Sequence, residues 1–146
     1  MSNINDLTKE APRSPRTRIR GYAILARALD KGRATLNGAA GEYHYACPLD
    51  MMLFDFKGVS ADDVKKQLED GLSDEEVAAW IDSHGKSKGT SEVTGWSDGV
   101  EAYRPYDSED KREWFVGVCK EAGIDPEKST LFDYLDADDK LSYATA

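Results

Sequence analysis

The stretch from Pro12 to Ala34 constrains the fold of this chain more than any other part of the sequence. Its Ser14-Pro15 pair is a helix-start signal, because a serine hydroxyl can accept a hydrogen bond from a free backbone N–H and proline suits the first helical position. Gly32 is typical of the residue that follows a helix, where the backbone turns left-handed. These signals predict a helix over residues 15–31.

The predicted helix carries an apolar stripe. Its apolar residues recur at spacings of three and four, as the buried face of a helix requires: Ile19, Tyr22, Ala26 and Leu29. Neighbouring apolar residues widen the stripe, so we expect this helix to lie at the centre of the fold.

Basic residues in and just before this helix form the predicted ligand-binding face: Arg13, Arg16, Arg20, Arg27 and Lys31. In one interpretation they are a solvated helix edge, paired with acidic neighbours such as Asp30. In the other they bind an anionic small molecule or an acidic protein surface, because arginine presents a planar fork that matches carboxylate or phosphate. The sequence leaves both interpretations open.

Charge is unevenly distributed along the chain. The net charge of the 146 residues is −9, yet residues 1–34 contain eight lysines and arginines against three acidic residues. This asymmetry is compatible with attraction between two halves of one domain, with a homo-oligomer, or with an acidic protein partner. The acidic remainder argues against general nucleic-acid binding, which needs a cationic surface.

Helix-start signals recur further along the chain, each a serine or threonine followed three residues later by an acidic residue: Ser60 with Asp63, Ser73 with Glu76, and Thr130 with Asp133. Together with the apolar periodicity they predict a mainly α fold. We expect a single compact domain of about seven short helices, with one small β-hairpin near residues 34–46. In this prediction residues 1–13 form an extended N-terminal arm, 14–139 the helical domain, and 140–146 a frayed tail.

Composition limits the cellular setting. The first residues lack the apolar segment of a signal peptide, and no apolar run is long enough to span a membrane. Cys47 and Cys119 are the only cysteines, unlike the dense disulfide framework of a small secreted domain. We therefore expect a soluble cytoplasmic protein with no membrane association.

A second candidate site lies in the segment YHYACPLD. His44, Cys47 and Asp50 fall within seven residues, and Cys47 directly precedes Pro48, at a predicted helix start that favours a thiolate. A nucleophilic thiol, a base and a carboxylate are the parts of a cysteine-dependent catalytic site. The alternative interpretation is an inert small buried cysteine beside a tyrosine-flanked histidine.

The sequence predicts no metal site and no cofactor. Its histidines and cysteines do not fall into a paired zinc spacing. The acidic run near the C-terminus lacks the glycine and glutamate of an EF-hand, although a loose Mg²⁺ site there remains an alternative. Neither of the glycine-rich phosphate-binding patterns, GxGxxG or GxxxxGK[ST], occurs.

Several separated motifs occur in the order of a known family: DLTKEAPRSPR, LDKGRA, GEYHYACPLD, SDEEV and LFDYLDADD. On these motifs the chain resembles an uncharacterised bacterial family known only as a domain of unknown function. The resemblance implies a bacterial single-domain cytosolic protein, and it brings no reaction, cofactor or catalytic residue. From the residues we expect a non-enzymatic binding or interaction domain, with a small Cys47 enzyme assisted by His44 as the alternative.

Overall fold

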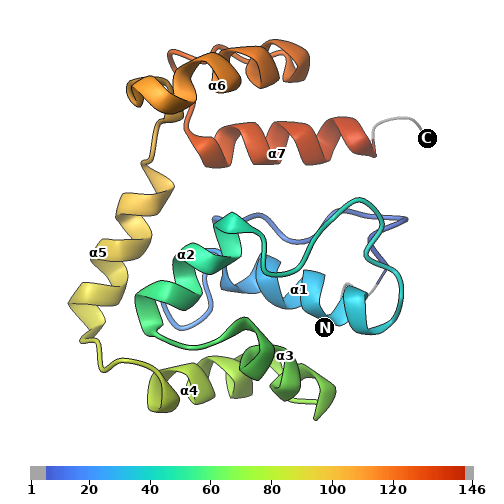
Figure 1. Ribbon diagram of the computed structural model, residues 1–146, viewed down its shortest axis with the longest axis vertical. Coiled ribbons are helices and arrows are strands. Elements are labelled where there is room, and N and C mark those ends of the chain that lie inside the picture. Colours follow the sequence, from blue (N-terminus) through green and yellow to red (C-terminus); the bar gives the residue numbers. More distant parts are fainter. Residues whose placement is uncertain (1–5, 144–146) are drawn as a thin grey trace.

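Seven α-helices account for most of the part of the chain that the computed structural model describes, residues 6–143 (Figure 1). They are α1 (Leu25–Leu36), α2 (Pro48–Lys57), α3 (Ala61–Glu69), α4 (Asp74–His84), α5 (Thr90–Glu101), α6 (Glu109–Ala122) and α7 (Leu131–Ser142), with a 3-10 turn at Pro105–Asp107 before α6. The predicted mainly α, single-domain fold is confirmed. The predicted hairpin near residues 34–46 is wrong, because residues 37–46 form turns and no β-strand occurs within residues 6–143. None of the described helices is long and apolar enough to cross a membrane.

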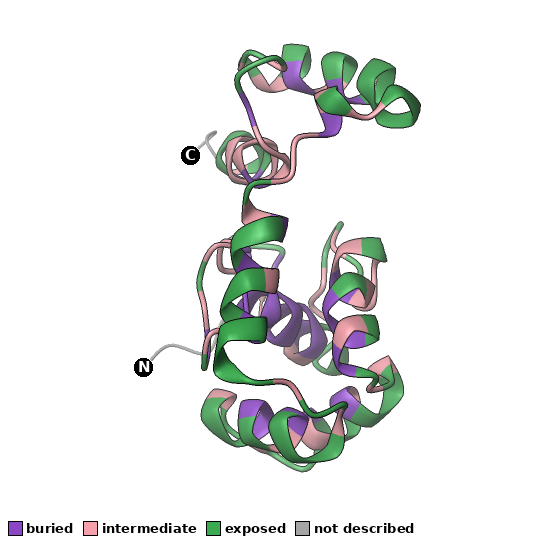
Figure 2. Ribbon diagram, turned by 90° about the vertical axis from the view of Figure 1, so that its left-hand side faces the viewer, coloured by how far each residue is buried: buried purple, intermediate pink, exposed green. Residues whose placement is uncertain are grey.

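The helices form two groups that α5 connects. Figure 1 shows α1 to α4 packed around one another at one end, α6 beside α7 at the other end, and α5 running along one side between them. Coloured by burial, α1 is almost entirely buried, whereas α5 and α6 expose most of their residues (Figure 2). The prediction that the helix of the 12–34 stretch is central is therefore confirmed.

The boundaries predicted for that helix are wrong at both ends. It begins at Leu25 instead of residue 15, and Gly32 lies inside it instead of after it. A helix cannot run through residues 20–24 into Leu25, because Arg20, Gly21 and Ile24 all have positive φ, at 52°, 86° and 75°. Within α1, Gly32 has a packing role. A Cβ at this position would lie 2.5 Å from Leu68 Cδ1, so glycine lets α1 and α3 approach closely.

A distant serine holds the non-helical segment in place. The fully buried Ser97 of α5 accepts a hydrogen bond from Ala23 N at 3.0 Å and donates one to Gly21 O at 2.6 Å. Ile24 N also donates to Pro15 O at 2.8 Å. These bonds satisfy backbone groups that a helix would otherwise pair internally, so tertiary contacts override the local helix signals.

The other predicted helix starts are confirmed. The Ser60, Ser73 and Thr130 hydroxyls each accept from the backbone N–H three residues on, and Ser73 and Thr130 form complete capping boxes. Cys47 is the N-cap of α2, with Pro48 at the first helical position.

The predicted arm and tail lie only partly within the described residues. Residues 1–5 and 144–146 lie outside the described part. Within it, residues 7–10 form turns, and Leu7 is buried with its N–H donating to Ala39 O at 2.8 Å. Helix α7 continues to Ser142, and the Tyr143 hydroxyl donates to Leu7 O.

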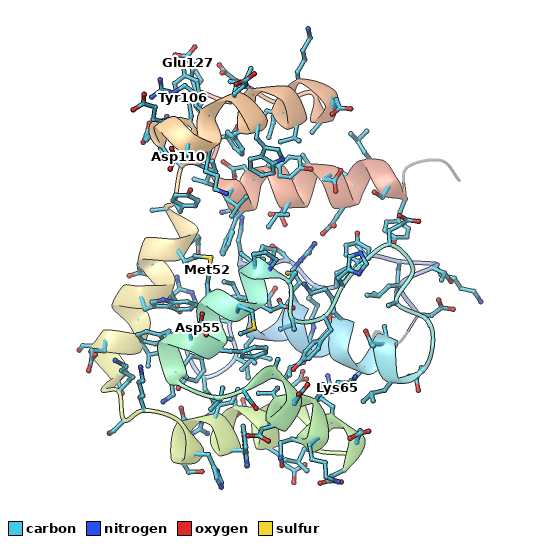
Figure 3. All side chains as sticks on the ribbon, viewed as in Figure 1. Met52, Asp55, Lys65, Tyr106, Asp110 and Glu127 are labelled. Carbon is cyan, nitrogen blue, oxygen red and sulfur yellow. The ribbon has the colours of Figure 1, made fainter. Side chains whose placement is uncertain are left out.

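Trp114 of α6 is 47% exposed. It lines an apolar groove of about 520 Å³ between α2 and the α6–α7 pair, together with Met52 and Asp110. Figure 3 labels Met52 on α2 and Asp110 at the start of α6, on the two sides of this groove.

Candidate functional site

The five predicted binding residues do not form one surface, because the chain bends between them. Each lies within salt-bridge distance of at least one carboxylate of the same chain. The Arg13 guanidinium bridges Asp30 and Asp74, with a shortest N–O distance of 2.9 Å to each. Hydrogen bonds to these carboxylates raise the pKa of the Arg13 guanidinium, although burial opposes the shift. The interpretation that two oppositely charged parts of one domain attract each other accounts for these contacts.

Arg16, Arg18 and Arg20 connect the N-terminal segment to three other elements. Arg16 Nε lies 3.0 Å from Asp136 Oδ2 of α7, Arg18 Nη2 lies 2.8 Å from Asp98 Oδ1 of α5, and Arg20 Nε lies 2.8 Å from Asp82 Oδ2 of α4. The basic residues that could drive self-association are thus engaged within one chain. Of the five predicted binding residues, Arg20 is the most exposed.

Arg27 and Lys31 are both buried, and each faces a buried carboxylate. Arg27 Nη1 lies 2.7 Å from Asp139 Oδ2, and the Tyr43 hydroxyl donates to Asp139 Oδ1 at 2.7 Å. Burial and this contact with Asp139 raise the pKa of Tyr43. Lys31 Nζ lies 3.0 Å from Asp50 Oδ2, and Asp50 is completely buried.

The Lys31 ammonium also donates to the Cys47 sulfur, at 3.1 Å. Asp50 Oδ2 accepts from Ala46 N at 3.0 Å, but Asp50 Oδ1 has no hydrogen-bond partner among the described residues. Burial raises the pKa of Asp50, and Lys31 opposes that shift. The structure therefore joins one residue of the predicted basic face to two residues of the predicted thiol site.

A pocket of about 590 Å³ opens beside this cluster. Four residues singled out in the sequence line it: Arg27, Lys31, His44 and Cys47. Apolar area comes from Leu7, Leu49, Leu135 and parts of Tyr43 and Tyr143. Such a size and lining are typical of small-molecule sites. Glu42 and Asp138 also line the pocket, so its charges are balanced and give an anion no net attraction.

The Cys47 sulfur lies at the start of a helix and beside a cation. Cys47 is the N-cap of the ten-residue helix α2, whose first-turn N–H groups carry partial positive charge, and Lys31 adds a full positive charge. His44 is exposed and makes no hydrogen bond to Cys47 among the described contacts. Lys31, not His44, is the partner of the thiol.

Residues 9–141 match the model of a known family, described as Domain of unknown function (DUF5069). The chain belongs to this family. Its membership confirms the resemblance to an uncharacterised domain family. A comparison with curated proteins finds no match.

In this DUF5069 domain, Lys57 and the loop at residues 85–89 were not among the site residues predicted from the sequence. Lys57 ends α2 and is 1% exposed, and Lys86 O accepts its ammonium hydrogen bond at 2.7 Å. The loop, GKSKG, leads directly into α5. Its lysines and glycines before a helix were the available signal. Within residues 6–143, no three or more His, Cys, Asp or Glu side chains converge as metal ligands would.

Proposed function

We propose that this domain binds a small molecule in the pocket beside Cys47 and that the thiol reacts with it. The observation that carries the proposal is the 3.1 Å contact between Lys31 Nζ and Cys47 Sγ at the start of α2. An adjacent cation and a helix N-terminus are the features that activate nucleophilic cysteines. Both act here on a sulfur that lines an open pocket.

The pocket lining suggests the class of substrate. Leucine and tyrosine side chains supply most of its surface, and its two cations, Lys31 and Arg27, are each already paired with a carboxylate, Asp50 and Asp139. This environment favours an uncharged molecule with an apolar part and an electrophilic carbon. In the reaction the thiolate forms a bond to that carbon, and the bond from the carbon to its leaving group breaks with the electron pair going to that group. His44, in the wall of the same pocket, can donate a proton to the leaving group.

The second candidate is a non-enzymatic binding domain that uses the same pocket. Among the described contacts, no hydrogen bond joins His44 to Cys47. This favours the binding domain, because a thiol enzyme of the predicted kind pairs its base with the sulfur. In this candidate Cys47 forms part of the wall.

Alkylation of the native protein by iodoacetamide at neutral pH, followed by peptide mass spectrometry, tests the proposal. Cys119 is fully buried and serves as the internal control in every sample. We expect Cys47 to react faster than cysteine in the urea-unfolded protein. The double variant Lys31→Met/Asp50→Asn removes both charges and keeps an acceptor for Ala46 N, and it should slow alkylation about tenfold or more.

Two outcomes separate the candidates. Reaction of native Cys47 no faster than in the unfolded chain would eliminate the nucleophile and leave the binding domain. His44→Ala should leave the alkylation rate unchanged, since Lys31 stabilises the sulfur. A rate that falls with His44→Ala and not with the Lys31/Asp50 double variant would restore His44 as the base.

A further inference from the structure

A second pocket, of about 470 Å³, lies where the end of α2, the loop at residues 85–89 and the start of α5 meet. Three cationic side chains line it, from separate parts of the chain: Arg20, Lys57 and Lys88. The pocket has one carboxylate in its lining, Asp82, and three hydroxyl groups, on Ser87, Thr90 and Thr94. Its lining is therefore cationic, in contrast to the balanced pocket at Cys47.

Lys57 is the unusual member of this group. Its side chain is almost completely buried, and the described residues offer its ammonium one hydrogen bond, to Lys86 O at 2.7 Å. No carboxylate among them lies within salt-bridge distance of Lys57, although the other cations of the pocket, Arg20 and Lys88, have such partners. A buried ammonium without a paired anion is unfavourable. A negatively charged ligand in the pocket would complete its environment.

The loop is built onto this lysine. Lys86 N donates to Lys57 O at 2.5 Å, which together with the bond to Lys86 O ties the loop to the end of α2 at two points. Gly85 makes the approach possible, because a Cβ there would lie 2.5 Å from Lys57 O. The close approach holds Ser87 and Lys88 at the rim of the pocket.

The start of α5 adds donors. Gly89 is its N-cap, and no side chain caps the helix. The first-turn N–H groups of a twelve-residue helix point out of its N-terminus and attract anions. Thr90, the first helical residue, also brings its hydroxyl to the pocket wall.

We propose that this pocket binds the phosphate group of a small phosphate-bearing molecule. Phosphate offers more acceptor oxygens than a carboxylate and so matches several cations, hydroxyls and helix N–H groups at once. Burial lowers the pKa of the Lys57 ammonium, and the negative charge of Asp82 offsets part of that shift. A bound anion would raise the pKa again. The site is independent of the Cys47 pocket, with which it shares no lining residue.

Inorganic phosphate is the probe. Titration of the full chain, followed by the chemical shifts of backbone amides in NMR, should show saturable shifts at residues 85–94, with chloride at equal ionic strength as the control. Acetate serves as the carboxylate comparison. Saturable shifts with phosphate and weak ones with acetate support the proposal. Equal responses to phosphate and chloride, or to phosphate and acetate, overturn it.

Variants test the residues. Lys57→Met keeps the length of the buried side chain without its charge and should weaken phosphate binding about tenfold or more. Lys88→Ala, at the rim, gives a second variant that leaves the buried Lys57 in place. Lys65→Met is the matched control, since Figure 3 shows Lys65 on α3 and it does not line the pocket. Unchanged affinity in folded Lys57→Met and Lys88→Ala contradicts the assignment.

Discussion

Arg27 of α1 donates two hydrogen bonds to Asp139 of α7, at 2.7 and 3.2 Å, although 112 residues separate them. Both side chains are nearly inaccessible to water, at 4% and 11% exposure. The pair joins the central helix to the last helix, and the Tyr43 hydroxyl donates to the same carboxylate. One buried ion pair thus fixes α7 against the wall of the Cys47 pocket.

Breaking this pair should be costly. Arg27→Met leaves Asp139 buried without its cation, and we expect the free energy of unfolding to fall by about 3–5 kcal/mol. The double variant Arg27→Met/Asp139→Asn keeps an acceptor for Tyr43 and leaves no unpaired buried charge, so it should lose less than the sum of the single changes. Urea unfolding of the four proteins measures both effects. Additive losses would show that the two residues act independently.

Acid should weaken the contacts of Asp74. Burial alone would raise the pKa of this carboxyl, but hydrogen bonds from Arg13 and Arg33 outweigh burial and lower it. The unfolded chain then binds a proton more readily than the native protein, so the stabilisation is present above the unfolded pKa of about 3.9 and is lost as pH falls through the lower native value.

The measurement is the unfolding free energy as a function of pH, from about pH 5 to about pH 2. Asp74→Asn should flatten the acid-side loss relative to the natural sequence. Glu113→Gln, on an exposed face of α6, is the control and should leave the curve unchanged. A curve for Asp74→Asn as steep as that of the natural sequence would contradict the role of this carboxylate.

Two glycine-to-alanine changes should have opposite signs. At Gly85 an added Cβ meets the Lys57 backbone oxygen at 2.5 Å, so Gly85→Ala should destabilise the protein and release the loop. At Gly95, inside α5, nothing lies within 4 Å, so alanine should stabilise by about 0.5–1 kcal/mol. Thermal unfolding and hydrogen exchange at residues 85–89 report the two effects. Similar melting temperatures for both variants would argue against the close approach.

Ser97 should matter more than its size suggests. Ser97→Ala removes the partner of two buried backbone groups, Ala23 N and Gly21 O, and we expect a loss of about 1–3 kcal/mol for each group left unsatisfied. Ser91→Ala, exposed on the same helix, is the control and should have little effect. Amide exchange at Ala23 provides a local readout, which should accelerate in the Ser97 variant alone.

Local signals predicted most of the helices. Ser73 caps α4 and Thr130 caps α7 through hydrogen bonds that span three residues, so the pattern is complete within a few consecutive positions. The start of α2 is likewise marked by consecutive residues, with Cys47 as the N-cap and Pro48 at the first helical position. Helix existence and most helix starts could therefore be predicted, because the interactions that decide them lie within one turn.

Long-range contacts decided what the sequence missed. The segment before Leu25 carries helix signals, yet Ser97, more than seventy residues away, supplies hydrogen bonds that hold it in left-handed turns. The basic residues share a helical spacing in the sequence, but once this segment bends they reach carboxylates on separate elements. Spacing along a helix predicts a common face only where the helix forms.

By itself the sequence determined the mainly α fold, the start of α2 at Cys47 and the family to which the chain belongs. Only the tertiary structure decided that Lys31 meets Cys47 and Asp50. It also decided that Lys57 is buried beside the loop at residues 85–89, with no carboxylate of residues 6–143 within salt-bridge distance. The physical reason is that caps and periodicity act over a few residues. Burial of a charge and the choice of its partner depend on which distant segments fold against it.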